Sequence, residues 1–306
     1  MWVRVLGAAA GGGFPQWNCN CPNCRAVRDG SAPCRPRTQS SLAVSGDYQH
    51  WFLFNASPDI RSQIEAFPPL RPQRALRHTP LQGVVLSDAE VDHTLGLLCL
   101  RETPLLHIYA TRWVHTAISE WNPILRTLRA YCKVVWQQLP LQEPVALRCT
   151  DGIDSGLRCQ AFSTGSGKTV AFAPGSDPHP EAVVGYRITD TRTGRALVYV
   201  PGVRELNAVV KEQLRDCAGL FFDGTCWVDD ELPRLGISRR PARAMGHVPI
   251  SGPGGSLEYL AALAVGRRVF IHINNTNPIL VENSPQRQAV EARGIEVAMD
   301  GMETEI

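Results

Sequence analysis

The chain has 306 residues, of which 44% are hydrophobic and 20% charged, an ordinary composition for a globular protein. Its formal net charge of +2 argues against a protein that coats nucleic acid or an anionic membrane. No apolar run reaches the ~18 residues of a transmembrane helix, and Met1–Gly7 does not resemble a secretion signal. We therefore expect a cytoplasmic protein with no membrane insertion and no nucleic-acid partner.

Short apolar runs rich in β-branched and aromatic residues predict strands along the whole chain. In order they are Val3–Leu6, Trp51–Phe54, Val84–Leu86, Leu106–Tyr109, Leu157–Phe162, Val184–Ile188, Ala196–Val200, Leu220–Phe222 and Val269–Ile273. Helices are predicted between several of them, at His93–Arg101, Glu205–Asp216, Ser256–Val265 and Gln286–Arg293. Strands dominate early, and strand and helix alternate near the end. This order predicts a single α/β domain over residues 1–306, a four-layer αββα sandwich.

Three cysteines lie close together near the N-terminus, in Asn18–Cys24. The spacing of Cys19, Cys21 and Cys24 lets their thiolates converge on one zinc ion at about 2.3 Å. The sequence therefore predicts a structural zinc in an N-terminal loop, at about residues 18–34. A fourth ligand is needed, and Cys34 is the nearest further thiol. The alternative is a loop of free thiols.

An acidic loop follows the predicted strand Val84–Leu86. Asp88, Glu90, Asp92 and His93 lie within six positions, between this strand and the next predicted helix. Crowded carboxylates repel one another, and a bound cation removes that repulsion. The alternative is a solvated acidic loop in which Asp92 caps the helix.

The register of this loop resembles a motif of metallo-β-lactamase-fold proteins. Their His-x-His-x-Asp-His sequence lies between a strand and a helix, and Asp88-x-Glu90-x-Asp92-His93 matches its spacing. Acids replace the first two histidines, which in that family help to hold the first of two zinc ions. The departure argues against a dinuclear zinc hydrolase.

Later segments extend the resemblance. His272 ends a predicted strand where the family's last histidine ligand is found, and His179 resembles the third histidine in its context. The family's bridging aspartate would follow Ala196–Val200, but Pro201 and Gly202 stand there. The resemblance thus implies the fold and part of the ligand set.

Two further motifs resemble individual branches of the fold. Met245-Gly246-His247 resembles the Gly-His segment of the tRNA-processing enzyme ribonuclease Z. The cysteine motif is similar to that of the phosphonate-pathway phosphodiesterase, in which a histidine three residues after the last catalytic one completes the zinc site. That position is Asn275 here, so Asn275, Cys34 and water all remain open as the fourth ligand.

A closer resemblance runs from residue 2 to about residue 302. It is carried by Gly11–Cys24, Arg37–Ser41, Phe54–Asp59, Ser87–Leu97 and His272–Pro278. From these segments the chain is identified as a member of the pyrroloquinoline quinone (PQQ) biosynthesis protein B family. The resemblance implies a role in making the redox cofactor PQQ from a cross-linked Glu-Tyr peptide. The family has been described both as a carrier of PQQ or its precursor to the periplasm and as an iron-dependent hydroxylase.

The donor set favours the hydroxylase. Asp92, His93 and His272 are one carboxylate and two imidazoles, the combination of the facial triad in non-haem Fe(II) oxygenases. We expect active-site Fe(II) on these residues, with Glu90 or His179 as an additional metal ligand. A hydrolase would instead use a zinc-bound water and usually a second metal.

Two histidines are predicted to act on the substrate. Deprotonation of a phenol raises the electron density of its ring, so His247 or His179 would assist as a base. The expected substrates are O₂ and a small amino-acid-derived PQQ precursor, and other PQQ-pathway proteins are candidate partners. The alternative is a non-catalytic carrier, which would bind anionic PQQ better with arginines than with the acidic loop.

Overall fold

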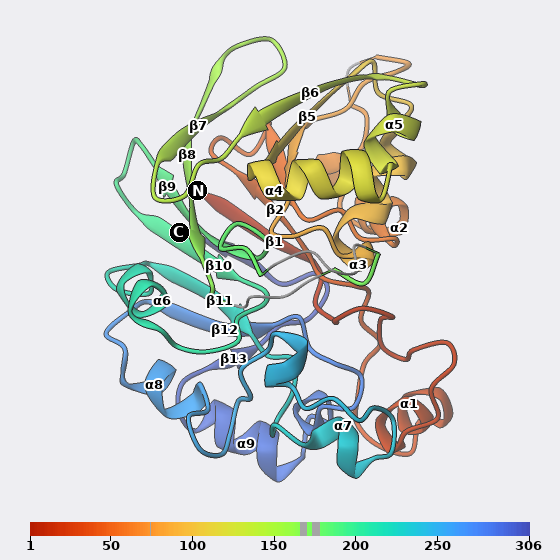
Figure 1. Ribbon diagram of the computed structural model, residues 1–306, viewed down its shortest axis with the longest axis vertical. Coiled ribbons are helices and arrows are strands. Elements are labelled where there is room, and N and C mark those ends of the chain that lie inside the picture. Colours follow the sequence, from red (N-terminus) through yellow and green to blue (C-terminus); the bar gives the residue numbers. More distant parts are fainter. Residues whose placement is uncertain (74, 166–169, 173–177) are drawn as a thin grey trace.

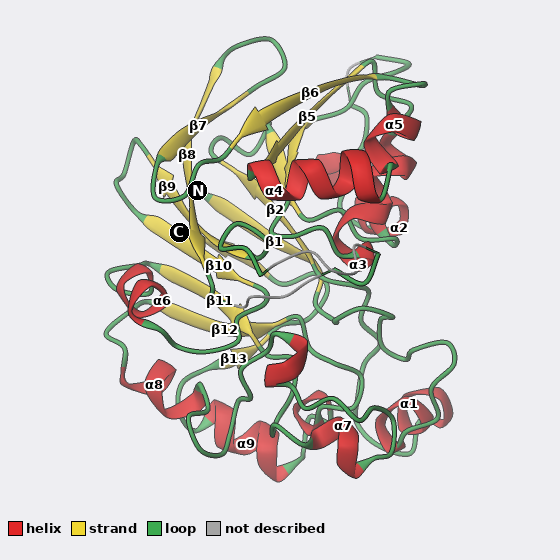
Figure 2. Cartoon of the chain, in the orientation of Figure 1, coloured by secondary structure: helices red, strands yellow, loops and turns green. Residues whose placement is uncertain are grey.

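Two facing β-sheets with helices on their outer sides form the protein (Figures 1 and 2). The structure is a computed structural model that describes residues 1–306 except 74, 166–169 and 173–177. The predicted four-layer αββα sandwich is confirmed. No helix within the described ranges is both long and apolar enough to cross a bilayer.

Each sheet has seven strands. The first runs in the order β14 (Glu303–Glu305), β1 (Trp2–Gly7), β2 (Ser41–Ser45), β3 (Trp51–Phe54), β4 (Leu81–Val85), β5 (Leu105–Ala110) and β6 (Lys133–Gln138). The second runs in the order β13 (Glu296–Val297), β12 (Arg267–Ile271), β11 (Gly219–Asp223), β10 (Ala196–Val200), β9 (Val184–Asp190), β8 (Asp154–Ser163) and β7 (Pro144–Arg148). Strands β3 to β6 are parallel, as are β10 to β13, so their carboxyl ends share an edge in each sheet.

Apolar side chains fill the space between the sheets and under the helices. Phe52 and Phe54 from the first sheet meet Tyr186, Tyr199 and Phe221 from the second, and all five are at most 1% exposed. Burial of such a side chain contributes about 1.5–3 kcal/mol, so this layer holds the two sheets face to face. The functional loops at the sheet edges therefore rest on a rigid support.

The helices lie on the two outer faces. They are α1 (Pro22–Asp29), α2 (Ile60–Glu65), α3 (Val91–Thr94), α4 (Arg112–Thr116), α5 (Ile124–Leu128), α6 (Ala208–Gln213), α7 (Glu231–Arg234), α8 (Leu257–Ala262) and α9 (Pro285–Glu291). Figure 1 shows α2 to α5 over the first sheet and α6, α8 and α9 over the second. The short α1 begins inside the cysteine motif, where the Cys21 side chain accepts a hydrogen bond from the N–H of Cys24.

All nine predicted strands are present, and the helix predicted at His93–Arg101 differs in form. It begins at Val91 as α3 and continues from Leu95 as a 3-10 helix. The N–H of Gly96 donates to the carbonyl of Ala56 at 3.0 Å instead of to a carbonyl of the helix. A side chain at this position would clash with the backbone of Ala56 and Ser57. Glu90, rather than Asp92, holds the N-cap position.

Candidate metal centre

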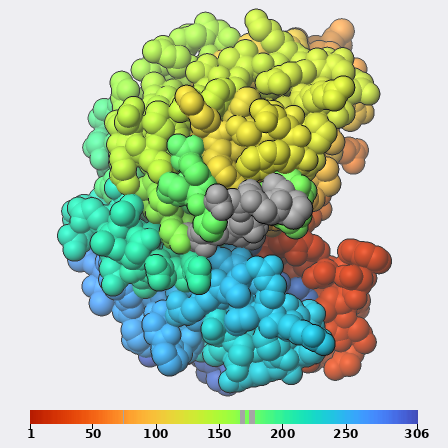
Figure 3. Space-filling view, viewed as in Figure 1, coloured from red at the N-terminus to blue at the C-terminus, as the bar shows by residue number. Residues whose placement is uncertain are grey.

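A cavity of about 420 Å³ opens where the two sheets present their carboxyl-terminal loops. In the space-filling view, residues from the first half of the chain (yellow) form the upper part of one face, and residues from its last third (cyan and blue) form the lower part (Figure 3). The cavity is lined by the loop after β4 and by the segments after β10, β11 and β12. Its described lining residues are Ala10, Gly11, Asp88, Glu90, Asp92, His93, Ala171, Val183, Pro201, Gly202, Thr225, Leu232, Arg240, Met245, Gly246, His247, His272 and Asn274.

Asp92, His93 and His272 come together at this cavity as the sequence predicts. Asp92 Oδ2 lies 3.4 Å from His272 Nε2 and 3.7 Å from His93 Nε2, and one ligand atom from each residue lies within 4.8 Å of the others. His93 is only 3% exposed, and its Nε2 has no hydrogen-bond partner in the described part of the chain. A buried imidazole nitrogen without a partner is costly, and a bound metal ion would remove that cost. The three residues thus fit a metal ion.

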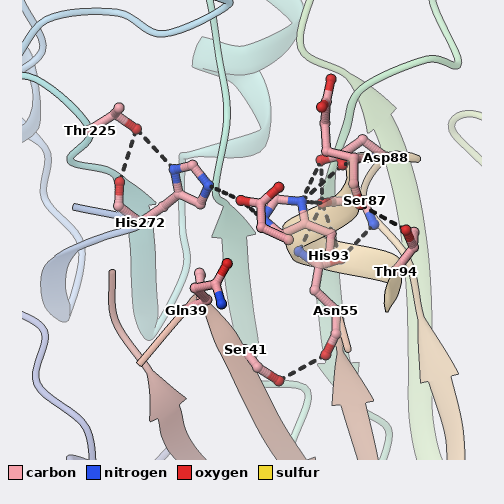
Figure 4. A network of polar contacts seen from close by, with 12 residues as sticks. Gln39, Ser41, Asn55, Ser87, Asp88, His93, Thr94, Thr225 and His272 are labelled. Carbon is pink, nitrogen blue, oxygen red and sulfur yellow. Dashed lines mark hydrogen bonds and ion pairs between the residues drawn. The ribbon is translucent and has the colours of Figure 1, made fainter. Parts of the chain in front are cut away.

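The opposite nitrogen of His93 is held by Asp88. His93 Nδ1 lies 2.9 and 2.8 Å from the two carboxylate oxygens of Asp88, which is itself 4% exposed (Figure 4). Burial lowers the pKa of His93, but the charges of Asp88 and Asp92 outweigh burial and raise it to about 9. A carboxylate that fixes one ring nitrogen directs the other to a metal and strengthens it as a ligand. Asp88 therefore positions His93, and the amino-acid sequence alone does not reveal this role.

The backbone at His272 is strained. Its φ is +58°, a conformation that non-glycine residues adopt rarely and that is found at functional sites. The residue directly follows β12 and is 5% exposed. Burial lowers the pKa of His272, which keeps its imidazole neutral and able to ligate a metal.

A third group adjoins the ligand set. His247 Nδ1 lies 2.9 Å from Asp223 Oδ2, and the His247 and His272 rings stack with centroids 5.2 Å apart. Asp223 ends β11 and is fully buried. With Nδ1 bound to the carboxylate, Nε2 is the remaining nitrogen of a ring that lines the cavity. His247 is thus placed to exchange a proton with a ligand in the cavity.

The structure separates the other two predicted site residues from the ligand set. Glu90 lines the cavity but is not part of the group whose ligand atoms lie within 4.8 Å. His179 is exposed, is not among the described residues around the cavity, and accepts a hydrogen bond at Nδ1 from the N–H of Glu181.

The cysteine motif forms a second candidate metal group. Sulfur atoms of Cys19, Cys21 and Cys24 lie within 4.8 Å of one another. The side-chain nitrogen of Asn275 lies 3.1, 3.6 and 3.3 Å from the three sulfurs in turn, and Cys34 is not part of the group. A half turn of the amide exchanges its nitrogen for its oxygen, and zinc accepts side-chain oxygen as well as sulfur ligands. Asn275 therefore stands where a fourth ligand is needed.

Comparison with known proteins gives the family. A family model described as a β-lactamase superfamily domain matches residues 50–273. Coenzyme PQQ synthesis protein B of Azoarcus sp. (strain BH72) is 48% identical over 305 residues, which cover 99% of each chain. The chain belongs to the coenzyme PQQ synthesis protein B family. A second family member, from Methylococcus capsulatus (strain ATCC 33009 / NCIMB 11132 / Bath), is 47% identical over 310 residues, again covering 99% of each chain.

Solved structures agree with this assignment. Zn²⁺-bound PqqB from Methylobacterium extorquens is 40% identical and superposes with a TM-score of 0.91, covering 100% of both chains. A diphosphatase of the PhnP family, 19% identical, superposes with a TM-score of 0.69 over 100% of this chain and 97% of its own. The latter likeness concerns the fold alone. The PqqB relative, in contrast, is a family member that holds zinc.

Proposed function

We propose that this protein hydroxylates the tyrosine-derived ring of a cross-linked Glu-Tyr precursor during PQQ synthesis. Fe(II) would be held by Asp92, His93 and His272, and O₂ would be the co-substrate. The observation that carries the proposal is the convergence of these three side chains around Nε2 of His93, which has no hydrogen-bond partner among the described residues. Bound Fe(II) in a two-histidine, one-carboxylate set supplies activation of O₂, with positions open for substrate. One oxygen atom enters the ring and the other leaves as water, so the assay also supplies a two-electron reductant.

The acidic loop supports this chemistry over hydrolysis. A hydrolase of this fold usually uses two metal ions, and Asp88 and Glu90, which replace its first two histidines, belong to no second ligand group among the described residues. Asp88 is committed to His93, and Glu90 lies outside the ligand set. The set retains three protein ligands, as expected of a mononuclear centre.

His247 would act as the base for the phenol. Its Nδ1–H donates to Asp223, which leaves the lone pair of Nε2 for the substrate proton. A phenol has a pKa near 10, so a base that removes its proton makes the ring more electron-rich. His179 lies outside the described cavity lining, so the geometry favours His247 for this role.

Labelled oxygen tests the reaction directly. With Fe(II), a reductant, ¹⁸O₂ and a linked Glu-Tyr amino acid, the protein is expected to yield a product that contains ¹⁸O in its ring, detected by mass spectrometry. Tight binding of the precursor without ¹⁸O incorporation would contradict the hydroxylase and favour the carrier. Controls without protein and with Zn²⁺ in place of Fe(II) account for uncatalysed oxidation.

One arginine at the cavity could bind an anionic ligand, as the carrier alternative requires. Among the described lining residues, Arg240 is the only arginine or lysine, beside the carboxylates of Asp88, Glu90 and Asp92. The Arg240 guanidinium donates to the carbonyl of Ala244 and is not paired with a carboxylate of the described chain. A carboxylate of the precursor is a suitable partner for it. One arginine is enough to orient a substrate carboxylate. The carboxylates of Asp88, Glu90 and Asp92 suit a bound cation better than an anionic cargo.

Replacement of this arginine should affect substrate binding more than turnover. Arg240→Gln is expected to raise KM by about 10-fold or more with little change in kcat, since hydrogen bonds to charged groups contribute about 1.5–3 kcal/mol. Arg239→Gln is the matched control, because Arg239 is also exposed but does not line the cavity. If KM changed equally in both variants, Arg240 would have no specific role in substrate binding.

A further inference from the structure

A single hydroxyl group links the metal-ligand set to the proposed base. Thr225 follows β11 by two residues and is 5% exposed. Its Oγ1 lies 2.7 Å from Asp223 Oδ1, 2.9 Å from His272 Nδ1, 2.9 Å from the His272 carbonyl oxygen and 3.0 Å from His247 Nδ1. Figure 4 shows the two contacts to His272. All of these hydrogen-bonding neighbours belong to the candidate site.

The number of protons decides how these groups bond. The hydroxyl has one proton and can accept others at its lone pairs. Its shortest contact is to the buried carboxylate of Asp223, and hydrogen bonds to charged acceptors are the stronger ones. When the proton points to Asp223, the hydroxyl cannot also donate to the carbonyl or to Nδ1 of His272, and a hydrogen on Nδ1 then makes its 2.9 Å contact with Oγ1 a hydrogen bond. The lone pair of His272 is then on Nε2, which lies 3.4 Å from Asp92.

The remaining contacts of Asp223 agree with this assignment. Its Oδ1 also accepts the N–H of Thr225 at 3.0 Å, and its Oδ2 accepts the N–H of Val203 at 3.0 Å and Nδ1–H of His247 at 2.9 Å. The carboxylate therefore receives hydrogen bonds on both oxygens and has no need of a cation. The group formed by Asp223, His247 and His272 resembles a metal site in its residue types, but the Thr225 hydroxyl lies within 3.0 Å of all three.

We infer that Thr225 is a positioning residue whose hydroxyl, oriented by Asp223, holds His272 as the Nδ1–H tautomer and so directs Nε2 to the metal. The same carboxylate fixes the tautomer of His247. The buried pair of Asp223 and Thr225 thus fixes the tautomers of both the ligand His272 and the base His247. On this inference, Asp223, His247 and His272 form a hydrogen-bond network and are not a second metal site. The inference rests on the three-ligand centre of the proposed function.

The affinity for a metal tests this role independently of turnover. Thr225→Val keeps the shape but removes the hydroxyl, and it is expected to weaken anaerobic Fe(II) or Co²⁺ binding by about 10–100-fold, as loss of a partner behind a metal ligand does. Thr225→Ser restores the hydroxyl and should bind within about 3-fold of wild type by the same reasoning. Equal affinities for wild type and Thr225→Val would overturn the inference.

A matched variant controls for general destabilisation. Thr164 is fully buried, and its hydroxyl donates to the backbone carbonyl of Val183 at 3.0 Å, away from the ligand set. Thr164→Val should lower the melting temperature as Thr225→Val does but leave metal affinity unchanged. An equal loss of metal affinity in both variants would assign the Thr225 effect to stability and overturn its specific role.

A measurement on the wild type keeps the inference testable if Thr225→Val does not fold. Long-range ¹H–¹⁵N NMR spectra of the zinc-loaded protein should show His272 protonated at Nδ1 and coordinated through Nε2. Coordination through Nδ1 would overturn the inference. If the wild type bound no metal at this site, the proposed function would fail, while the tautomer of His272 in the metal-free protein would still test the hydrogen-bond assignment.

Discussion

Replacement of either histidine of the ligand set is expected to abolish iron retention and substrate-dependent O₂ uptake. Removal of His93 or His272 leaves two protein ligands, which hold Fe(II) poorly in competition with buffer and water. Activity should fall by at least about 100-fold, because every productive turnover needs the metal in place. Metal content after anaerobic reconstitution and gel filtration, followed by oxygen-electrode measurements, gives both results on one sample.

The choice of substitution matters at His93. His93→Ala would leave Asp88 buried without its partner, which costs stability in addition to metal binding. His93→Gln keeps a side-chain amide donor for the Asp88 carboxylate, so it separates the two effects. His272→Ala lacks this complication at Asp88, and the two variants together test the ligand set. Persistence of O₂ uptake in both would show that the metal is held elsewhere.

Two other histidines provide matched controls. His179→Ala is expected to retain iron and activity, since His179 is exposed and outside the described cavity lining. His247→Ala should retain iron but lose turnover, because His247 is assigned to proton transfer and not to metal binding. The loss of turnover should be about 10²–10⁴-fold, the usual contribution of a positioned base. A large loss in His179→Ala with none in His247→Ala would reverse the assignment of the base.

Removal of the cysteine group is expected to have the second large effect, on stability. Cys21→Ser or Cys24→Ser should release the zinc and lower the melting temperature by about 5–10 °C or more, since structural zinc contributes several kcal/mol to folding. Burial raises the pKa of Cys21 to about 12, so without a cation this residue is a neutral thiol at pH 7. Cys24 is fully buried and lies in α1, so the loss would loosen that helix. Zinc content and thermal unfolding measure the two effects.

Single substitutions also decide the fourth zinc ligand. Asn275→Ala is expected to weaken zinc binding, whereas Cys34→Ser should not, because Cys34 lies outside the group. Cys99→Ser is the neutral control, since Cys99 is exposed and belongs to no metal group of the described residues. Zinc loss in Cys34→Ser with zinc retained in Asn275→Ala would make Cys34 the fourth ligand. Asn275 is three residues from His272, so the zinc loop also supports the segment that holds the active-site ligand.

The sequence predicts those strands whose apolar runs are buried on both faces. Strands β3, β10 and β11 are examples, because each is wholly buried and flanked by loops. The edge strands β14, β6, β13 and β7 were missed, and so was β2, which lies inside the first sheet and is wholly buried but has a serine at each end of a short apolar run. The β6 side chains are exposed or half-buried, and β13 has only two residues, so neither has an apolar pattern that stands out. The pairing partners that make these segments strands are distant in the sequence.

The grouping of Asp92, His93 and His272 could be predicted because the acidic loop and the last histidine match a family motif at fixed spacing. The roles of Asp88 and Thr225 could not, since each depends on a contact formed only in the folded chain. Asp88 reaches His93 across the α3 turn, and Thr225 reaches His272 across neighbouring strand ends. The role of Asn275 was one of three possibilities, and its position among the three sulfurs favours it over Cys34. Polar residues at the end of a buried strand or just after it are the signal that could have drawn attention to Asp223 and Asp88.

The most direct test of a mononuclear iron centre is metal content and O₂ uptake of the wild-type protein after anaerobic reconstitution with Fe(II). The substrate is an amino acid derived from linked Glu and Tyr, and a reductant is supplied. A mononuclear iron centre beside a structural zinc predicts about one iron and one zinc per chain and O₂ uptake that depends on the precursor. Tight binding of the precursor by iron-loaded protein with no O₂ uptake would contradict it.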